Sequence, residues 1–133
     1  MNQAQLAAEY AQAWGDHNPD AIVAMHTEDT VFHLHGDLPP ATGRQAVRDT
    51  IANLFAHVPD LRFDARRMYF GDDHMVFEYE MSGTADGKAF VCDGVDVISL
   101  RDGLVARKDT YIDLATYERQ AGALPGSSST SNT

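Results

Sequence analysis

One stretch of the chain, residues 89–113, places an acid and an amine inside a mostly apolar pattern. The sequence RDG at 101–103 is typical of a tight turn between two strands. Asp96 and Lys108 are then predicted to share one strand face with small or apolar neighbours, because side chains alternate along a strand. An acid on such a face is costly without a partner. The two residues therefore form either a structural ion pair or the polar part of a pocket.

The predicted register of this hairpin starts from Leu100 opposite Leu104. Counting outward gives three further pairs: Asp96 with Lys108, Gly94 with Thr110, and Cys92 with Ile112. The opposite face carries several apolar side chains, namely Val91, Val95, Val97 and Tyr111. These predict a homodimer packed through its outer sheet faces. The alternative is a lone sheet face left half hydrated.

Further candidates for chemistry lie outside the hairpin. Tyr10 is on the apolar stripe of a helix, as either a core tyrosine or a site residue. His26 is expected on the inner side of a second helix. An unperturbed pKa of about 6.5 would suit His26 as a base, although a core histidine is the plainer interpretation. His33 and His35 share a strand face like a metal-binding pair, but no third ligand stands at a telling spacing, and we predict no metal site.

The elements that position these residues follow from periodicity and turn signals. Helices are predicted over 2–16, from an Asn18 cap to residue 29, from a capping box at Thr42 to residue 57, and from an Asp113 cap to Gly122. Strands are predicted over 30–35, 62–70 and 74–84, followed by the hairpin. This order indicates an α+β fold in which helices pack against one face of a curved antiparallel sheet. Such a sheet, closed by helices, forms a cone with an internal cavity, which is a usual place for a ligand.

Length and composition limit the classes of function. A chain of 133 residues predicts a single domain, here residues 1–125, with a disordered polar tail at 126–133. The net charge of −10 argues against nucleic acid and anionic membranes as partners. One cysteine excludes an internal disulfide framework, and neither a signal peptide nor a membrane-spanning stretch is visible. We therefore expect a cytoplasmic location.

The order of elements and several stretches within it resemble the NTF2-like superfamily, and within it the SnoaL-like and ketosteroid isomerase-like proteins. The resemblance covers residues 10–117. The stretches that carry it are Asp20–Met25, Leu38–Arg44, Asp93–Val97 and Tyr111–Asp113. It implies a conical fold around an apolar cavity, frequent dimerisation, and no metal or organic cofactor. The fold hosts enzymes and non-catalytic binders alike.

The resemblance also assigns positions in a site. Ketosteroid isomerases use a tyrosine of the first helix and a protonated aspartate of the penultimate strand as an oxyanion hole, and Tyr10 and Asp96 fall on these positions. The family's catalytic base falls on Leu34, which disfavours steroid isomerisation by that mechanism. An amine at Lys108 departs from the family too. A cation beside Asp96 favours its carboxylate, so Lys108 and Tyr10 become the expected donors.

The sequence also resembles the limonene-type epoxide hydrolases, particularly over the proline loop at 38–44 and over Tyr111–Leu114. The catalytic triad of limonene-type epoxide hydrolases falls on Phe77, Tyr79 and Thr110, which disfavours epoxide hydrolysis. SnoaL-type polyketide cyclases use an acid near the start of the last helix, where Asp113 stands, although a helix cap explains this residue equally well. The conical fold further implies pocket walls made of Trp14, Phe32, Leu34, Phe55, Phe77, Tyr79, Met81, Cys92, Thr110 and Ile112.

The resulting prediction is a small-molecule enzyme that applies general acid/base chemistry to a hydrophobic carbonyl compound, as an isomerase, polyketide cyclase or dehydratase would. Its catalytic residues are predicted to be Tyr10, Asp96, Lys108 and His26. The first alternative is a non-catalytic protein that binds a hydrophobic small molecule in the same cavity. The second is an interaction domain whose cavity is filled by large side chains.

Overall fold

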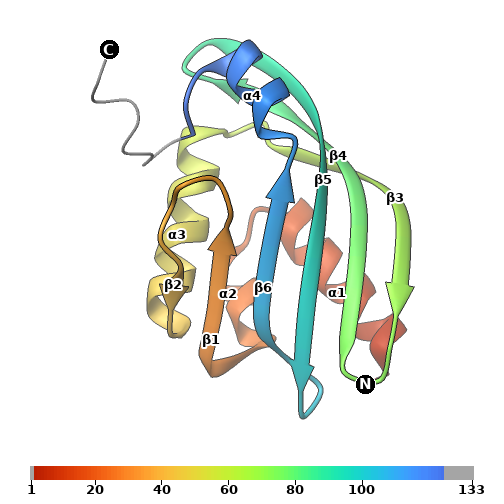
Figure 1. Ribbon diagram of the computed structural model, residues 1–133. Helices are drawn as coiled ribbons and strands as arrows, with labels where there is room; N and C mark the ends of the chain where they lie inside the picture. The colour runs from red at the N-terminus through yellow and green to blue at the C-terminus, as the bar shows by residue number, and fades with distance from the viewer. Residues whose placement is uncertain (1, 125–133) are drawn as a thin grey trace.

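A six-stranded sheet, in the order β2-β1-β6-β5-β4-β3, curves around the N-terminal helices in the computed structural model, which describes residues 2–124 (Figure 1). The elements are α1 (Gln3–Gly15), α2 (Pro19–Ala24), β1 (His26–Leu34), β2 (Ala41–Thr42), α3 (Arg44–His57), β3 (Arg62–Phe70), β4 (His74–Ala85), β5 (Lys88–Arg101), β6 (Leu104–Ile112) and α4 (Leu114–Ala121). The α+β cone predicted from sequence is confirmed. One pair, β1 with β6, is parallel, so the sheet is mixed where an antiparallel one was expected.

Helix α1 supplies one wall of the cone. A capping box holds its start, since the Asn2 side chain accepts from the Gln5 amide (2.8 Å) and the Gln5 side chain accepts from the Asn2 amide (2.9 Å). Leu6, Tyr10 and Trp14 recur at every fourth position and are all buried. The helix therefore turns one apolar stripe toward the sheet.

The predicted length of the second helix is wrong. Helix α2 ends at Ala24, and His26 is the first residue of β1, where it pairs with Val105 of β6. The spacing of Ile22 and His26 fits a helix, but the β-branched residues that follow favour a strand, and pairing with β6 decides the outcome. His26 nevertheless lies beside Tyr10, whose hydroxyl is 2.8 Å from Nε2 of the imidazole.

The capping box predicted at Thr42 is also wrong. Thr42 belongs to the two-residue strand β2 and pairs with Val31. The N-cap of α3 is Gly43, with a φ of +90° and no side-chain cap bond. Glycine is suited to this backbone conformation, which lets the chain turn directly from β2 into the helix.

The hairpin of β5 and β6 has the predicted faces but not the predicted register. Asp102 and Gly103 form a two-residue turn with positive φ at both positions, so Arg101 rather than Leu100 pairs with Leu104. A bulge at Ala106 then shifts the register once more. The observed pairs are Asp96 with Thr110, Gly94 with Ile112, and Ile98 with Lys108. Two shifts of one residue add up to two, which returns every side chain to its predicted face.

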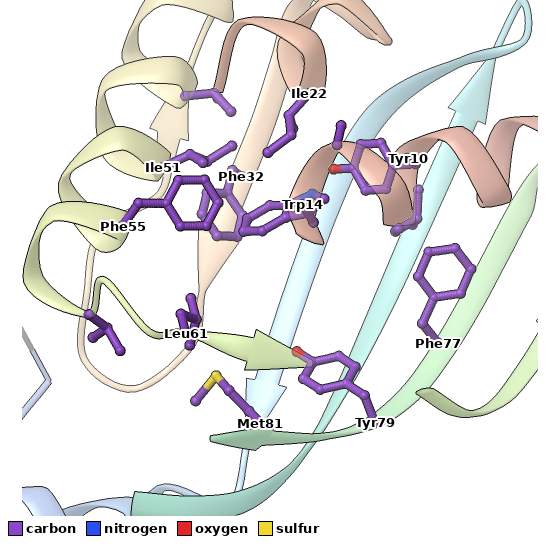
Figure 2. Close-up of a cluster of buried hydrophobic side chains, with 14 of the residues drawn as sticks. Tyr10, Trp14, Ile22, Phe32, Ile51, Phe55, Leu61, Phe77, Tyr79 and Met81 are labelled. Atoms are coloured by element: carbon purple, nitrogen blue, oxygen red, sulfur yellow. The ribbon is translucent and has the colours of Figure 1, made fainter. Parts of the chain in front are cut away.

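The inner face of the sheet and the helices share one core centred on Trp14. Its ring lies edge-on to Phe32, Phe55 and Phe63, at centroid distances of 6.4, 5.6 and 5.8 Å. Figure 2 shows side chains of β4, among them Phe77 and Tyr79, projecting toward these rings from the opposite side. The space between the two groups is where the cavity described below lies.

Helix α4 closes one end of the cone. Asp113 caps it, as predicted, by accepting from the amide of Thr116 at 3.1 Å, and Phe90 of β5 contacts the Tyr117 ring at 4.8 Å. Of the helices within residues 2–124, none is long and apolar enough to cross a membrane. The predicted polar tail, residues 126–133, lies outside the described residues.

Candidate functional site

A cavity of about 420 Å³ lies between α1 and the inner face of the sheet. Most of the residues predicted as pocket walls line it: Trp14, Phe32, Leu34, Phe77, Tyr79, Met81, Thr110 and Ile112. The lining also includes apolar residues that the sequence had not singled out, such as Leu61, Phe63 and Leu124. The polar and charged residues of the lining include Tyr10, Tyr79, Asp96, Lys108 and Thr110, together with Arg62 and Glu78.

The polar cluster is organised around Asp96. Lys108 donates to Oδ2 at 2.5 Å, and both side chains are almost fully buried. Tyr79 and Thr110 donate to Oδ1 at 2.9 and 2.7 Å. Lys108 reaches Asp96 diagonally, from the position opposite Ile98. Three donors thus compensate the burial of this carboxylate and leave one of its roughly four acceptor positions, on Oδ2, available.

Tyr79 reaches Asp96 because Gly94 lies opposite it on β5. A methyl group at Gly94 would stand 2.5 Å from Cε1 of the tyrosine ring, so only glycine leaves room for the ring to cross the strand. Burial raises the pKa of the Tyr79 hydroxyl, and the charge of Asp96 raises it further. The group is therefore a permanent donor. The sequence had indicated Tyr79 only as a pocket wall, although a glycine facing a tyrosine was a usable signal.

The ammonium group of Lys108 lies among aromatic rings. Its Nζ is 4.6 Å from the ring centre of Trp14, 5.6 Å from that of Tyr10 and 5.9 Å from that of Phe32. These distances fall within the range in which a ring face attracts a cation. The Trp14 indole nitrogen is buried and has no hydrogen-bond partner among the described residues. No described residue therefore accepts from this donor in the wall around Lys108.

Tyr10 belongs to a second polar chain behind the cavity wall. Its hydroxyl lies 2.8 Å from Nε2 of His26, whose Nδ1 is 2.8 Å from Oγ1 of Thr30. His26 is fully buried and does not line the cavity. Burial, together with the charges of Lys108 and Arg44, lowers the pKa of His26 to about 3, so the ring is neutral. Burial also raises the pKa of Tyr10, which keeps its proton.

Besides His26, three residues considered for the site lie outside the cavity lining. Cys92 and Phe55 do not line the cavity, contrary to prediction. Phe55 packs behind Trp14 and stacks on His17 at 4.2 Å, while the Cys92 thiol is buried in the core, where burial raises its pKa to about 11. Asp113 caps α4 and lies outside the lining. None of the three offers a group to a ligand in the cavity.

Comparison with protein families gives one match that covers most of the chain. The model of the SnoaL-like domain matches residues 7–108. Among proteins of curated function, none matches this chain. The matched range spans the positions of Tyr10, Tyr79, Asp96 and Lys108 and ends before Thr110.

Solved structures share the fold over nearly its whole length. A protein of ketosteroid isomerase-like fold from Catenulispora acidiphila, in complex with trimethylamine, has a TM-score of 0.82 at 20% identity, covering 92% of this chain and 96% of that chain. An NTF2-like protein from Burkholderia pseudomallei has a TM-score of 0.83 at 18% identity, covering 92% and 99%. A protein described as a SnoaL-like polyketide cyclase from Shewanella putrefaciens has a TM-score of 0.78 at 20% identity, covering 90% and 96%. At these identities the similarity shows the fold alone.

Proposed function

The chain belongs to the SnoaL-like domain family, and on that basis we propose that it is an enzyme acting by general acid/base chemistry on a hydrophobic carbonyl compound. The observation that carries the proposal is the buried Asp96–Lys108 pair in the wall of an apolar cavity. A buried ion pair contributes little to stability compared with apolar side chains of similar volume. Facing a cavity, it supplies a fixed positive charge to any ligand oxygen that enters.

In this proposal Lys108 and Tyr10 are the catalytic donors. Both would hydrogen-bond the carbonyl oxygen and stabilise the negative charge that develops there when the neighbouring carbon loses a proton. Asp96 keeps Lys108 in place through the 2.5 Å bond, and its remaining acceptor position is the one available to take that proton. The product is an enol or enolate, the intermediate common to isomerisation, aldol cyclisation and dehydration next to a carbonyl.

His26 would set the direction in which Tyr10 donates. The hydroxyl of Thr30 can either donate to or accept from Nδ1 of the ring. When Thr30 donates, Nε2 carries the hydrogen and donates to the Tyr10 oxygen, which frees the tyrosine proton for a ligand. His26 is thus proposed as a residue that positions the Tyr10 hydroxyl, without touching the ligand itself.

The cluster also favours one class of ligand over another. A solved relative binds trimethylamine, but here the ammonium of Lys108 already occupies the space over the rings of Tyr10 and Trp14. A second cation beside it would be repelled. We therefore expect neutral or anionic oxygen compounds, such as ketones, enols and phenols, rather than amines.

Exchange of carbon-bound hydrogen for deuterium tests the proposal without knowledge of the natural substrate. The probe is α-tetralone, a bicyclic ketone, incubated with the protein in deuterium oxide and followed by NMR. An enzyme that forms the enolate should accelerate exchange beside the carbonyl. Tyr10→Phe should slow this exchange at least about tenfold, as should the combined Asp96→Leu and Lys108→Met, which removes both buried charges together.

Matched controls are the exposed Tyr69→Phe and Lys88→Met, which lie outside the cavity and should exchange the ketone at the wild-type rate. Binding of the ketone without accelerated exchange would refute catalysis of this type. Exchange that is equal in wild type and in both site variants would refute the assigned residues.

A non-catalytic binding protein is the second candidate function. Two observations favour it: Leu34 lines the cavity where the related isomerases carry their base, and three donors already occupy Asp96. Such a protein would bind the ketone in the same cavity and leave the rate of deuterium exchange unchanged. The exchange experiment therefore separates the two candidates.

We also propose that the chain forms a homodimer through the outer face of the sheet. Val91 and Tyr111 on this face are 48% and 46% exposed, and Val97, two residues beyond the register partner of Tyr111 on β5, is 38% exposed. Large apolar side chains gathered on one face favour a covered surface. Light scattering on the purified protein would give the mass of the particle directly. The expected cytoplasmic location and the domain limits at residues 1–125 stay predictions.

A further inference from the structure

A second cluster of ligand-type side chains lies on the sheet face opposite the cavity. His33 projects from β1 and His35 directly follows the end of that strand, while Asp109 from the neighbouring strand β6 is the register partner of His33. One donor atom from each of the three residues lies within 4.8 Å of the others. All three side chains are half-buried, and none lines the cavity. The third ligand missing from the sequence pattern is thus supplied from another strand, 74 residues away from His35.

We propose that His33, His35 and Asp109 form a binding site for a divalent transition-metal ion such as Zn²⁺. Two imidazoles and a carboxylate are ligands that zinc takes readily, with a fourth position left to water. This site is independent of the proposed acid/base chemistry, because it lies on the other face of the sheet. The cluster could instead be a hydrogen-bonded surface network only, and the two alternatives differ in what a titration with metal would show.

The hydrogen bonds of the cluster leave ligand atoms available. Nε2 of His33 lies 2.9 Å from the carbonyl oxygen of Leu38. A carbonyl only accepts, so Nε2 must carry the hydrogen, and in the neutral ring Nδ1 then has a free lone pair. A backbone carbonyl bonded to the second ring nitrogen is the usual support of a metal-binding histidine. His33 is therefore already held in the tautomer that a metal ion needs.

The distances require only local adjustment. Ligand atoms about 2.0–2.1 Å from a tetrahedral ion are roughly 3.3 Å from each other. Nε2 of His35 and Oδ1 of Asp109 are 2.9 Å apart, so an ion replacing the hydrogen between them would widen the gap slightly. The longest separation, up to 4.8 Å, would have to shorten by about 1.5 Å. Rotation of a half-buried imidazole can supply this, while the stacking of His35 on Tyr111 at 4.1 Å keeps that ring in place.

Arg107 should weaken the binding of a metal ion at this site. Its guanidinium donates to both oxygens of Asp109, at 2.7 and 2.9 Å, and its charge repels a cation at the same carboxylate. The site should therefore be weaker than a zinc site that holds a fold together. It follows that removing the charge should tighten binding, an effect that a mere hydrogen-bonded network has no reason to show.

The experiment is a titration of the untagged protein with Zn²⁺ by calorimetry, repeated with Co²⁺, whose visible absorption reports its coordination. We expect one ion per chain, whether the protein is a monomer or a dimer, because all three ligands come from one chain. His33→Gln, His35→Gln and Asp109→Asn should each raise the dissociation constant at least about tenfold, and Arg107→Gln should lower it. The matched control is His74→Gln, an exposed histidine beside Asp73 on the turn between β3 and β4.

Four results would overturn the proposal. The first is the absence of saturable binding to the wild type. The second is binding that only one or two of the three ligand variants weaken. The third is weakening by His74→Gln as strong as that by the ligand variants, which would indicate nonspecific surface sites. The fourth is Arg107→Gln binding no more tightly than the wild type. Circular dichroism of each variant identifies any that fails to fold, and Asp109→Asn and Arg107→Gln are the mildest changes.

Discussion

The hairpin of β5 and β6 carries an acid paired with a base on each of its two faces. On the inner face, the side chains of Asp96 and Lys108 are 9% and 5% exposed and border the cavity. On the outer face, those of Asp109 and Arg107 are 15% and 43% exposed and lie beside His35. Partial burial opposes ionisation of Asp109, yet bonds from Arg107 and His35 hold its pKa below its usual range.

The two pairs have similar chemistry but different surroundings. A buried charge depends on its partner, because no water can replace that partner when it is removed. A partly exposed pair has water and salt as substitutes, and its net contribution is small. The same kind of pair is thus costly to bury inside the cone and contributes little to stability outside it. The difference should appear in the free energy of unfolding of variants at the two pairs.

The largest effect is expected from breaking the inner pair. Asp96→Asn leaves the Lys108 ammonium buried without a counter-charge and should lower the free energy of unfolding by about 3–5 kcal/mol. The corresponding outer change, Asp109→Asn, should cost about 1 kcal/mol or less. Urea unfolding followed by circular dichroism measures both values.

Replacing the whole inner pair sharpens this prediction. The combined Asp96→Leu and Lys108→Met should recover at least about half of the stability that Asp96→Asn loses, because no buried charge remains. If Asp96→Asn lowers the free energy of unfolding no more than Asp109→Asn does, burial does not make the inner pair more important for stability than the outer pair.

The next effect concerns the polar chain behind the cavity. Tyr10→Phe removes the partner of Nε2 of His26 and leaves a buried ring nitrogen unsatisfied. The expected loss is about 1–3 kcal/mol in the free energy of unfolding, measured with urea. Tyr69→Phe, on a side chain 52% exposed, is the matched control and should change stability little. Equal losses in the two variants would contradict the buried bond.

His26 should also make stability depend on pH. Its pKa is lowered to about 3 in the folded protein, against about 6.5 in the unfolded chain. Between these values the unfolded chain binds more protons, so stability falls as pH drops, by about 2 kcal/mol between pH 7 and pH 5. In His26→Gln the slope should be shallower by that amount. Parallel slopes in wild type and variant, from urea unfolding at several pH values, would refute this role.

The smallest effect on stability is expected from the outer pair of Arg107 and Asp109. Arg107→Gln removes a partly exposed guanidinium and should cost at most about 1 kcal/mol in the free energy of unfolding. The cost should shrink further when salt is added, since surface ion pairs are screened. Urea unfolding at low and high salt measures it. A cost above that of Tyr10→Phe would show that the outer pair stabilises the fold at least as strongly as the inner polar chain does.

Sequence reasoning located the elements and faces well, because both depend on local signals. The alternation of β5 assigned Asp96 and Lys108 to one face even though the register was wrong, since an error of two residues preserves the face. The helix cap at Asp113 could be predicted for the same reason: capping is local.

What escaped prediction depends on contacts between distant residues. His26 fits a helical spacing, and only pairing with β6 makes it a strand residue. The donors to Asp96 from Tyr79 and Thr110 come from two other strands, and no pattern along one strand reveals them. The contact between Asp109 and His35 could not be predicted for the same reason, because the two residues are far apart in the sequence.

The central claim is that the inner pair offers a donor site to a ligand oxygen. Calorimetric titration with a naphthol and with its methyl ether tests it most directly, because the ether has the same apolar rings but cannot form an oxyanion. We expect the wild type to bind the naphthol at least about fivefold more tightly, the value of one hydrogen bond. This preference should disappear in the combined Asp96→Leu and Lys108→Met, and shrink in Tyr10→Phe. Equal affinity for the two compounds in the wild type, or a preference that survives in both variants, would refute the donor site and leave an apolar pocket beside a structural ion pair.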